Sequence, residues 1–505
     1  MGSSVGSRGR RSAFISPALK QTGAVSLDPR TPVLVGVGQI SRRPEDADGL
    51  TRPLDLMVEA VRVASSDAGV PGLEEKVGLV GVVESLGWRT PDAATIVARE
   101  LGANGARRIL TATGGNGPLS LLHEVCNQIS AGKLDSAVIT GGEAFYSRRL
   151  ATKLGTRAPE APADSEVEDQ LLGDPRPGSL PAEIEVGIGL PTQVYPLFST
   201  ARAGFLGESP ETHRRRCAEL WSDFSRVAAG NPHAWVRKEF SADEILTESP
   251  TNRPVAYPYT KRMCANIQVD QAAAVVVMSA GAAEAAGVPR YRWVFPTAGA
   301  DSQDTWFVTE RADLHSSPAI SDCWAALAGA TGLGVNDVAH IDLYSCFPSA
   351  VMTAADAIGV SLDRQLTLTG GLGFAGGPGN AYCLHSLAQA VDAVRHHPAP
   401  ALVTGVGWFL TKHAATLLGP EPPSQWHHAS PKTQRGSRSV TLGPGPDLEQ
   451  EAFTVFYDRD GSALGAVVTA LSPKGGRHVL RTADPDCALA LISGQQVDLG
   501  DGTFS

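Results

Sequence analysis

The sequence of 505 residues has few of the features that mark secreted, membrane-spanning or nucleic-acid-binding proteins. Its seven cysteines are widely spaced and include no Cys-x-x-Cys pair, which argues against a disulfide framework or a zinc site and favours a reducing compartment. The longest uncharged stretch, 365–391, contains six glycines and a proline, so it does not suit a membrane span. A net charge of -10 disfavours general attraction to nucleic acid or anionic membranes. We therefore expect a cytoplasmic protein without a metal site, whose partner is a small or apolar molecule.

Strand and helix patterns alternate over the first part of the chain. With 42% hydrophobic and 19% charged residues, the sequence has the composition of a folded globular protein, and its length exceeds one ordinary domain. Residues 1–30 lack an apolar core, and we expect a flexible tail there. The patterns predict strands and helices in the order 33–38, 53–68, 77–83, 93–101 and 108–112. This alternation favours an α/β fold with a parallel sheet.

A pattern of glycine loop, buried helix and strand occurs twice. The loop at 113–117 precedes a helix with apolar residues at helical spacing and a strand at 137–140. The loop at 376–379 precedes a second such helix and a strand at 401–404. The shared order predicts two related α/β halves rather than one long sheet.

Changes in composition divide the chain further. We expect an N-terminal half at 31–285, with an insertion at 146–260 that is richer in proline, arginine and acids, and a C-terminal half at 286–420. Residues 421–438 read as a linker. Residues 439–505 contain a hairpin pattern at 453–471 and predict a small β-rich domain. An oligonucleotide-binding (OB) barrel is a topological option for this domain, but its charges nearly cancel, so nucleic acid is not expected as a ligand.

Five segments together resemble the thiolase superfamily over roughly 31–420, especially the sterol-carrier-protein-associated thiolases and the actinobacterial type 1 thiolase-like proteins. They are the GGNG loop, ITGGEAF at 139–145, DLYSCFP at 342–348, the GGPGN loop and TGVGWFLTKH at 404–413. The resemblance implies a five-layer α/β thiolase fold with an inserted loop domain, coenzyme A thioesters as ligands and no covalently bound cofactor. It also implies a homodimer formed through the strand at 108–112, although a monomer is equally open.

The resemblance places the thiolase chemistry at positions where this chain has other residues. Thiolases hold the acyl group on a cysteine at a helix N-terminus, and that position corresponds here to Gly114 or Gly115. The two histidines that bind an oxyanion correspond to Tyr344 and Gly377, and an acid/base cysteine corresponds to Gly405. Because glycine cannot attack an acyl group and oxyanion donors are lost, we expect ordinary thiolytic activity to be close to zero.

The remaining candidates each have two interpretations. Cys346 and Tyr344 are either catalytic or simply buried side chains. Lys412 and His413 are either acid/base or anion contacts, or a solvated pair, and 214–216 is either a phosphate contact for coenzyme A or a solvated helix face. The two glycine loops either present backbone amides to a ligand or only turn the chain. The loop residues concerned are Gly114, Gly115, Asn116, Gly117, Gly376, Gly377, Gly379 and Asn380.

These observations support three hypotheses on function. The first is a noncanonical acyl-CoA acyltransferase or lyase of lipid metabolism, related to acetyl-CoA acetyltransferases, that uses Cys346 or a bound water. The second is a noncatalytic acyl-CoA or lipid-binding module. The third is a scaffold that binds a protein partner through its C-terminal domain. Whether the chain is an enzyme stays open at this point, because fold resemblance alone does not establish chemistry.

Overall fold

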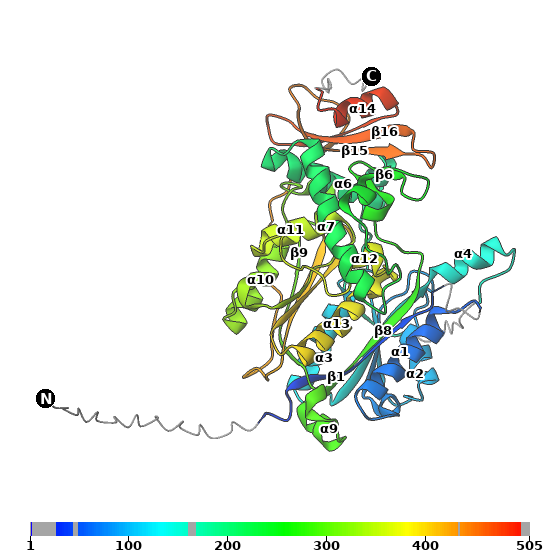
Figure 1. Ribbon diagram of the computed structural model, residues 1–505, viewed down its shortest axis with the longest axis vertical. Coiled ribbons are helices and arrows are strands. Elements are labelled where there is room, and N and C mark those ends of the chain that lie inside the picture. Colours follow the sequence, from blue (N-terminus) through cyan, green and yellow to red (C-terminus); the bar gives the residue numbers. More distant parts are fainter. Residues whose placement is uncertain (1, 3–26, 44–48, 160–167, 433–434, 496–505) are drawn as a thin grey trace.

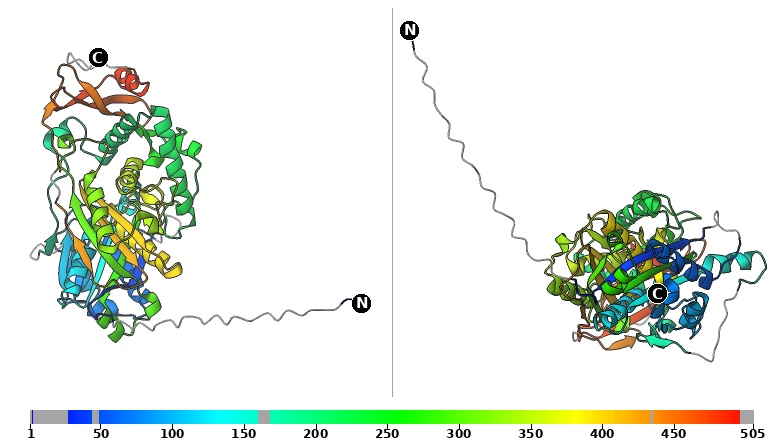
Figure 2. Two further views of the ribbon diagram at one scale, coloured as in Figure 1. Left: turned by 90° about the vertical axis from the view of Figure 1, so that its left-hand side faces the viewer. Right: turned by 90° about the horizontal axis from the view of Figure 1, so that it is seen from below.

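The computed structural model describes residue 2 and residues 27–43, 49–159, 168–432 and 435–495, which form two stacked α/β halves and a third sheet at one end (Figures 1 and 2). The predicted tail at 1–30 lies mostly outside the described residues. No helix among the described residues combines the length and the apolar character needed to cross a membrane.

The N-terminal half contains a mixed sheet whose inner strands β8, β4 and β2 are buried throughout. Its six strands run in the order β1-β8-β4-β2-β3-β5. The central strand β8 is an Ala/Val run that is buried throughout, as expected for a strand covered by helices on both sides. The elements of this half are β1 (Pro32–Ser41), α1 (Pro53–Asp67), β2 (Leu79–Val82), α2 (Ala93–Glu100), β3 (Arg107–Thr111), α3 (Gly117–Ser130), β4 (Ser136–Ala144), β8 (Asp270–Ser279) and α9 (Ala280–Ala285).

The C-terminal half repeats this plan with a sheet in the order β10-β11-β12-β9-β13. The segment 421–438, expected as a linker, contributes the edge strand β13 (His427–Ala429), which pairs in parallel with β9. The other elements are β9 (Phe295–Gln303), α10 (Pro318–Thr331), β10 (His340–Asp342), α11 (Pro348–Ile358), α12 (Gly371–Phe374), α13 (Tyr382–His396), β11 (Ala401–Gly407) and β12 (Lys412–Gly419).

Helices α3 and α13 form the central layer between the two sheets. Helix α13 contacts β8 of the first sheet and β11 of the second, and α3 contacts β4, β8, β11 and β12. Helices α1 and α2 cover the outer face of the first sheet, while α10 packs on the outer face of the second (Figure 1). This arrangement confirms the predicted five-layer thiolase fold.

The insertion is mostly helical. Its longest helix, α7, begins after Ser209, whose hydroxyl accepts a hydrogen bond from the Thr212 amide, and its buried face includes Leu220, Trp221 and Phe224. The elements of the insertion are α4 (Phe145–Lys153), β5 (Gln170–Leu172), α5 (Pro181–Glu185), α6 (Pro191–Leu206), α7 (Pro210–Gly230), α8 (Ala242–Leu246), β6 (Pro254–Ala256) and β7 (Tyr259–Thr260).

The short strand β5 occupies the outer edge of the first sheet. It pairs in parallel with β3, so β3 is hydrogen-bonded to β2 on one side and to β5 on the other. The resemblance implied that a second subunit would pair with β3. Because β5 already fills that edge, a partner subunit cannot pair directly with β3.

The C-terminal region forms a sheet with strands of the insertion, in the order β14-β17-β16-β15-β6-β7. The predicted hairpin is confirmed, because β15 and β16 pair antiparallel. The elements are β14 (Val440–Leu442), β15 (Glu449–Tyr457), β16 (Ala463–Leu471), β17 (Arg477–Thr482) and α14 (Pro485–Ile492). The region is therefore built into the molecule and is not tethered as a separate module, while its OB-like character stays a prediction.

Candidate functional site

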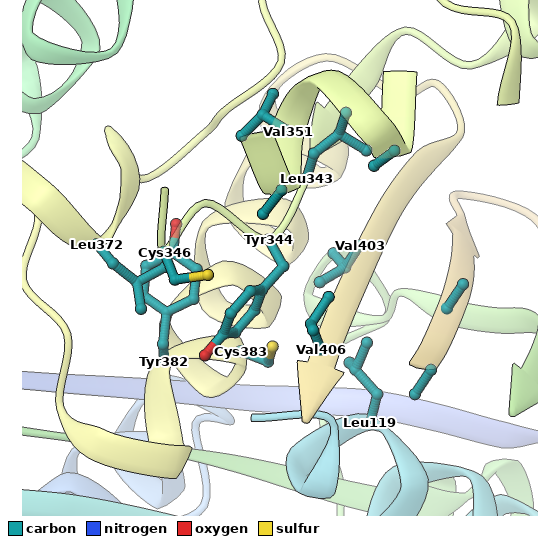
Figure 3. Close-up of a cluster of buried hydrophobic side chains, with 14 of the residues drawn as sticks. Leu119, Leu343, Tyr344, Cys346, Val351, Leu372, Tyr382, Cys383, Val403 and Val406 are labelled. Carbon is teal, nitrogen blue, oxygen red and sulfur yellow. The ribbon is translucent and has the colours of Figure 1, made fainter. Parts of the chain in front are cut away.

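The two glycine loops meet between the sheets, at the N-termini of α3 and α13. The side chain of Asn380 joins them: its Oδ1 accepts a hydrogen bond from the Gly114 amide at 3.0 Å, and its Nδ2 donates to the carbonyl oxygen of Glu84 at 2.9 Å. The structure thus brings together Gly114, Gly115 and Asn380, which the sequence singled out. Tyr344, Cys346, Tyr382 and Cys383 lie in the same cluster (Figure 3).

Gly115 has no room for a side chain. A Cβ atom at this position would lie 2.4 Å from the Tyr344 hydroxyl and 2.6 Å from the carbonyl oxygen of Val406. The Tyr344 ring is held edge-on against Tyr382, with 5.6 Å between the ring centroids. Burial raises the pKa of Tyr344 well above its usual value, so its phenol stays protonated at neutral pH.

Gly114 is enclosed by the ends of two side chains. Its φ of 150° disfavours any residue with a side chain, and a Cβ would lie 2.6 Å from Asn116 Oδ1 and 2.9 Å from Lys412 Nζ. The two positions that correspond to the thiolase nucleophile are therefore bordered by Tyr344 and Lys412 of the C-terminal half and by Asn116 of the first glycine loop.

Two other glycines of the second loop also make close contacts. A Cβ at Gly376 would lie 2.1 Å from Gln271 Oε1, and one at Gly379 would lie 2.4 Å from Glu143 Oε1. Gly377 differs, because the nearest atoms to its Cβ position are 3.4 Å away or more, which is ordinary van der Waals contact. Gly377, at which the resemblance places a thiolase histidine, thus has room for a Cβ atom.

Lys412 and His413 point to opposite sides of β12. The Lys412 amine donates a hydrogen bond to the carbonyl oxygen of Thr113, beside the first glycine loop. His413 lies on the other face, where its Nε2 is 3.3 Å from the Ser317 hydroxyl and 3.5 Å from Asp304 Oδ2. Both residues are buried, so the interpretation as a solvated pair is wrong. Of the two, only Lys412 reaches the glycine loops.

Cys346 is buried beside an aromatic side chain and not beside a base. Burial raises the pKa of its thiol to about 12, and a hydrogen bond with Tyr195 offsets only part of that shift. The Tyr195 hydroxyl also donates to the carbonyl oxygen of Trp408 at 3.0 Å. A cysteine nucleophile needs a nearby base or cation to stabilise the thiolate, and Tyr195 supplies neither.

We expect Cys346 to react very slowly with iodoacetamide in the folded protein. At every pH below its raised pKa the thiol stays mostly protonated. At pH 8 the thiolate fraction of Cys346 is therefore about a thousandfold below that of an ordinary cysteine. Peptide mapping after timed alkylation would measure this, with guanidinium-unfolded protein as the reactive reference. Folded-state labelling of Cys346 at the unfolded rate would contradict the prediction.

Sequence reasoning missed Cys383 and Glu143. Cys383, in the first turn of α13, donates from Sγ to the carbonyl oxygen of Gly115 at 3.0 Å. The sequence feature that could have indicated Cys383 is its position shortly after the second glycine loop. Glu143 accepts hydrogen bonds from the Ser85 hydroxyl and the Leu86 amide, and burial raises its pKa to about 7. The sequence feature that could have indicated Glu143 is a single acid within the otherwise uncharged strand β4.

A cluster of His123, Asp301 and His428 is the one group among the described residues with ligand atoms close enough to hold a metal ion. Asp301 Oδ2 lies 2.6 Å from His123 Nδ1 and 2.8 Å from His428 Nε2. The indole of Trp426 donates to Asn127 Oδ1, which leaves the Asn127 amide nitrogen to donate to His428 Nδ1. His428 then carries its proton on Nε2 and donates it to Asp301, so this nitrogen is not free to bind a metal. The arrangement fits a hydrogen-bonded relay better than a metal centre.

The charge of Asp301 is stabilised by this network. Burial alone would raise the pKa of Asp301, but the charge and hydrogen bond of His123, with the donors His428 and Ser120, bring it below its usual value. Ser120 also accepts a hydrogen bond from the Asn116 side-chain amide at 3.2 Å. The relay therefore fixes the orientation of Asn116 at the first glycine loop.

A groove lined by arginine borders the site on the far side of Glu143. It has a volume of about 570 Å³, and its walls include Trp88, Arg89, Arg148 and Arg157, with no acidic residue among the described residues that line it. Gly87, another wall residue, donates its amide to Glu143. The groove thus combines positive charge with an aromatic surface, a combination that suits a phosphorylated ligand.

The arginines at 214–216 are used in ion pairs on the insertion. Arg214 pairs with Glu248 at 3.0 Å, Arg215 with Asp243 at 2.6 Å, and Arg216 with Glu208 at 2.5 Å. These contacts favour the interpretation as a helix face over that as a phosphate site.

Comparison with solved structures gives matches over most of the chain. A monomeric SCP2-thiolase-like protein type 1 from Mycobacterium smegmatis is 31% identical, with a TM-score of 0.76, over 94% of this chain and 96% of that one. An Ltp2-ChsH2(DUF35) aldolase and an acetyl-CoA acetyltransferase from Syntrophomonas wolfei are each 17% identical, cover 77% of this chain and 98% and 99% of theirs, and have TM-scores of 0.58 and 0.54. These last two share the fold alone. No family model matches the sequence, and no curated protein does either.

Proposed function

Because this chain belongs to the SCP2-thiolase-like proteins of type 1, within the thiolase superfamily, we propose that it binds acyl-CoA thioesters without transferring the acyl group through a cysteine. The observation that carries the proposal is the filled nucleophile position. Tyr344 occupies the space of a side chain at Gly115, and Lys412 with Asn116 occupies that at Gly114. No residue here can therefore act as the thiolase nucleophile, and a side chain at Gly115 would clash with the backbone as well as with Tyr344.

The other cysteines of the cluster do not replace this nucleophile. Cys346 has a pKa raised to about 12, and burial raises the pKa of Cys383 well above its usual value. Both thiols are therefore protonated at neutral pH, and thiol groups are far weaker nucleophiles than thiolates. The hypothesis of an acyltransferase that uses Cys346 fits this geometry less well than the binding hypothesis.

The arginine groove supports a coenzyme A ligand. The nucleotide part of coenzyme A carries several phosphate groups and an adenine ring. Arg89 and Arg148 offer guanidinium groups to phosphates, and the largely buried Trp88 forms part of the wall. Because the groove is linked through Glu143 to the second glycine loop, a ligand held there lies next to the residues that resemble the thiolase site.

We expect saturable binding of acetyl-CoA, acetoacetyl-CoA or a longer acyl-CoA by calorimetry, with no covalent adduct in the intact mass of the same sample. Replacement of Arg148 by alanine should weaken binding about tenfold, a loss of about 1.4 kcal/mol. Arg149→Ala is the matched control, because this exposed arginine neighbours Arg148 on α4 but is not part of the groove.

Two results would overturn this assignment. An acyl adduct on Cys346 that free coenzyme A removes would show acyl transfer through that cysteine. Failure of every coenzyme A thioester to bind would instead favour the scaffold hypothesis.

A further inference from the structure

Lys412 is a buried lysine at the start of β12. Only 8% of the residue is exposed, and its aliphatic stem packs beside the first glycine loop, where a Cβ at Gly114 would lie 2.9 Å from Lys412 Cε. Lysine is rarely buried to this extent unless its charge is paired. Its surroundings therefore decide what the amine does.

The amine has no direct ionic partner among the described residues. Its hydrogen bond is to a neutral acceptor, the Thr113 carbonyl oxygen, and the indole rings of Trp306 and Trp408 lie 5.9 and 6.0 Å from Nζ. The charged groups that face it act from farther away. They are Asp174, which is paired with Arg176, and Glu84, which accepts a hydrogen bond from the Thr113 hydroxyl.

This environment makes the neutral amine available near physiological pH. Burial lowers the pKa of Lys412 to about 8, and Asp174 and Glu84 only partly oppose the shift. A lysine without a direct carboxylate partner in a desolvated site is the usual setting of a nucleophilic amine.

A polar atom without a partner lies beside the amine. Asn116 Oδ1 is buried and accepts no hydrogen bond, since its amide group is turned toward Ser120. Asn116 Oδ1 and Lys412 Nζ both lie within 3 Å of the Cβ position of Gly114. Thr113, Asn116 and Trp408, which surround this corner, are each partly exposed.

We propose that Lys412 is a reactive amine that captures an aldehyde or ketone as an imine, with Asn116 Oδ1 accepting a hydrogen bond from the adduct. This goes beyond thioester binding, since it concerns a carbonyl group that carries no coenzyme A. The nitrogen lone pair bonds to the carbonyl carbon, a proton moves from nitrogen to oxygen, and the carbinolamine then loses water to give the imine. No oxidant or reductant is needed, and hydrolysis reverses the reaction.

A small diketone tests this without relying on coenzyme A. The full-length protein is incubated with pentane-2,4-dione, whose imine rearranges to a stable enaminone, and the modified lysines are mapped by mass spectrometry. At pH 7.5 Lys412 should react at least about tenfold faster than the exposed Lys133 and Lys153, because far more of its amine is neutral. The rate should rise with pH to a midpoint near 8.

Variants separate a reactive amine from general surface labelling. Lys412→Arg keeps a positive charge and removes the nucleophile, so it should abolish the fast phase and leave Lys133 unchanged. Asn116→Ala should slow the fast phase without moving its pH midpoint. The proposal fails if Lys412 reacts no faster than the exposed lysines in the wild-type protein, a result that would leave acyl-CoA binding unaffected.

Discussion

Replacing Gly115 with cysteine is expected to lower the free energy of unfolding by about 1–3 kcal/mol and to yield no thiolase activity. The new Cβ would lie 2.4 Å from the Tyr344 hydroxyl and 2.6 Å from the Val406 carbonyl oxygen, so the loop or the tyrosine must shift. Urea denaturation and a thiolysis assay with acetoacetyl-CoA would measure the two effects.

The matched control is a substitution at the other glycine loop. Gly377→Ala places a Cβ at ordinary contact distance from Asn266 and Leu372, so its unfolding free energy should change by less than about 1 kcal/mol. Gly115→Ala separates the steric effect from that of the thiol and should be destabilised like Gly115→Cys. If Gly115→Cys were as stable as the wild-type protein and catalysed thiolysis, the space beside Gly115 would be open to a side chain and the prediction would be wrong.

Replacing Arg477 with methionine is expected to destabilise the protein by about 3–5 kcal/mol. This guanidinium is fully buried and makes a bidentate pair with Glu451, at 2.6 and 2.5 Å, within the C-terminal sheet. It also donates to the carbonyl oxygens of Thr309 and Arg311, at 2.7 and 2.6 Å, in the C-terminal half. The methionine variant would leave a buried carboxylate and two carbonyl groups without their donor.

Arg481 on the same strand provides the comparison. It is exposed and donates a single hydrogen bond to the carbonyl oxygen of Glu185, so Arg481→Met should cost less than about 1 kcal/mol. Denaturant titration gives both values, and limited proteolysis shows whether β14 to β17 loosen first. Equal stability of the two variants would mean that Arg477 does not anchor the C-terminal sheet.

Local patterns in the sequence were sufficient to predict most elements of the fold. The uncharged Ala/Val run of β8 and the helical spacing of apolar residues in α3 and α13 each predict their element without tertiary information. The strands β5 and β6 could not be predicted in this way. Each has three residues; β5 pairs with β3, which lies far away in the sequence, and β6 pairs both with the neighbouring β7 and with the distant β15.

For the site, the sequence indicated which residues are missing but not what fills the space. Tyr344 was recognised at a histidine position, yet its contact with Gly115 depends on how the two halves pack. Strand alternation implies that Lys412 and His413 face opposite ways, but not which of them meets the glycine loop. The partner of Cys383, 268 positions away, could be found only from the folded chain.

The strand β5 has a consequence for how this protein can vary. A symmetric dimer presents every substitution twice, once on each side of its twofold axis, and changes near that axis meet their own copies. Here the sheet edge beside β3 is closed by a segment of the same chain, so a change in β3 does not meet its own copy across this edge. At this edge a substitution in β3 therefore has to remain compatible only with β2 and β5 of its own chain.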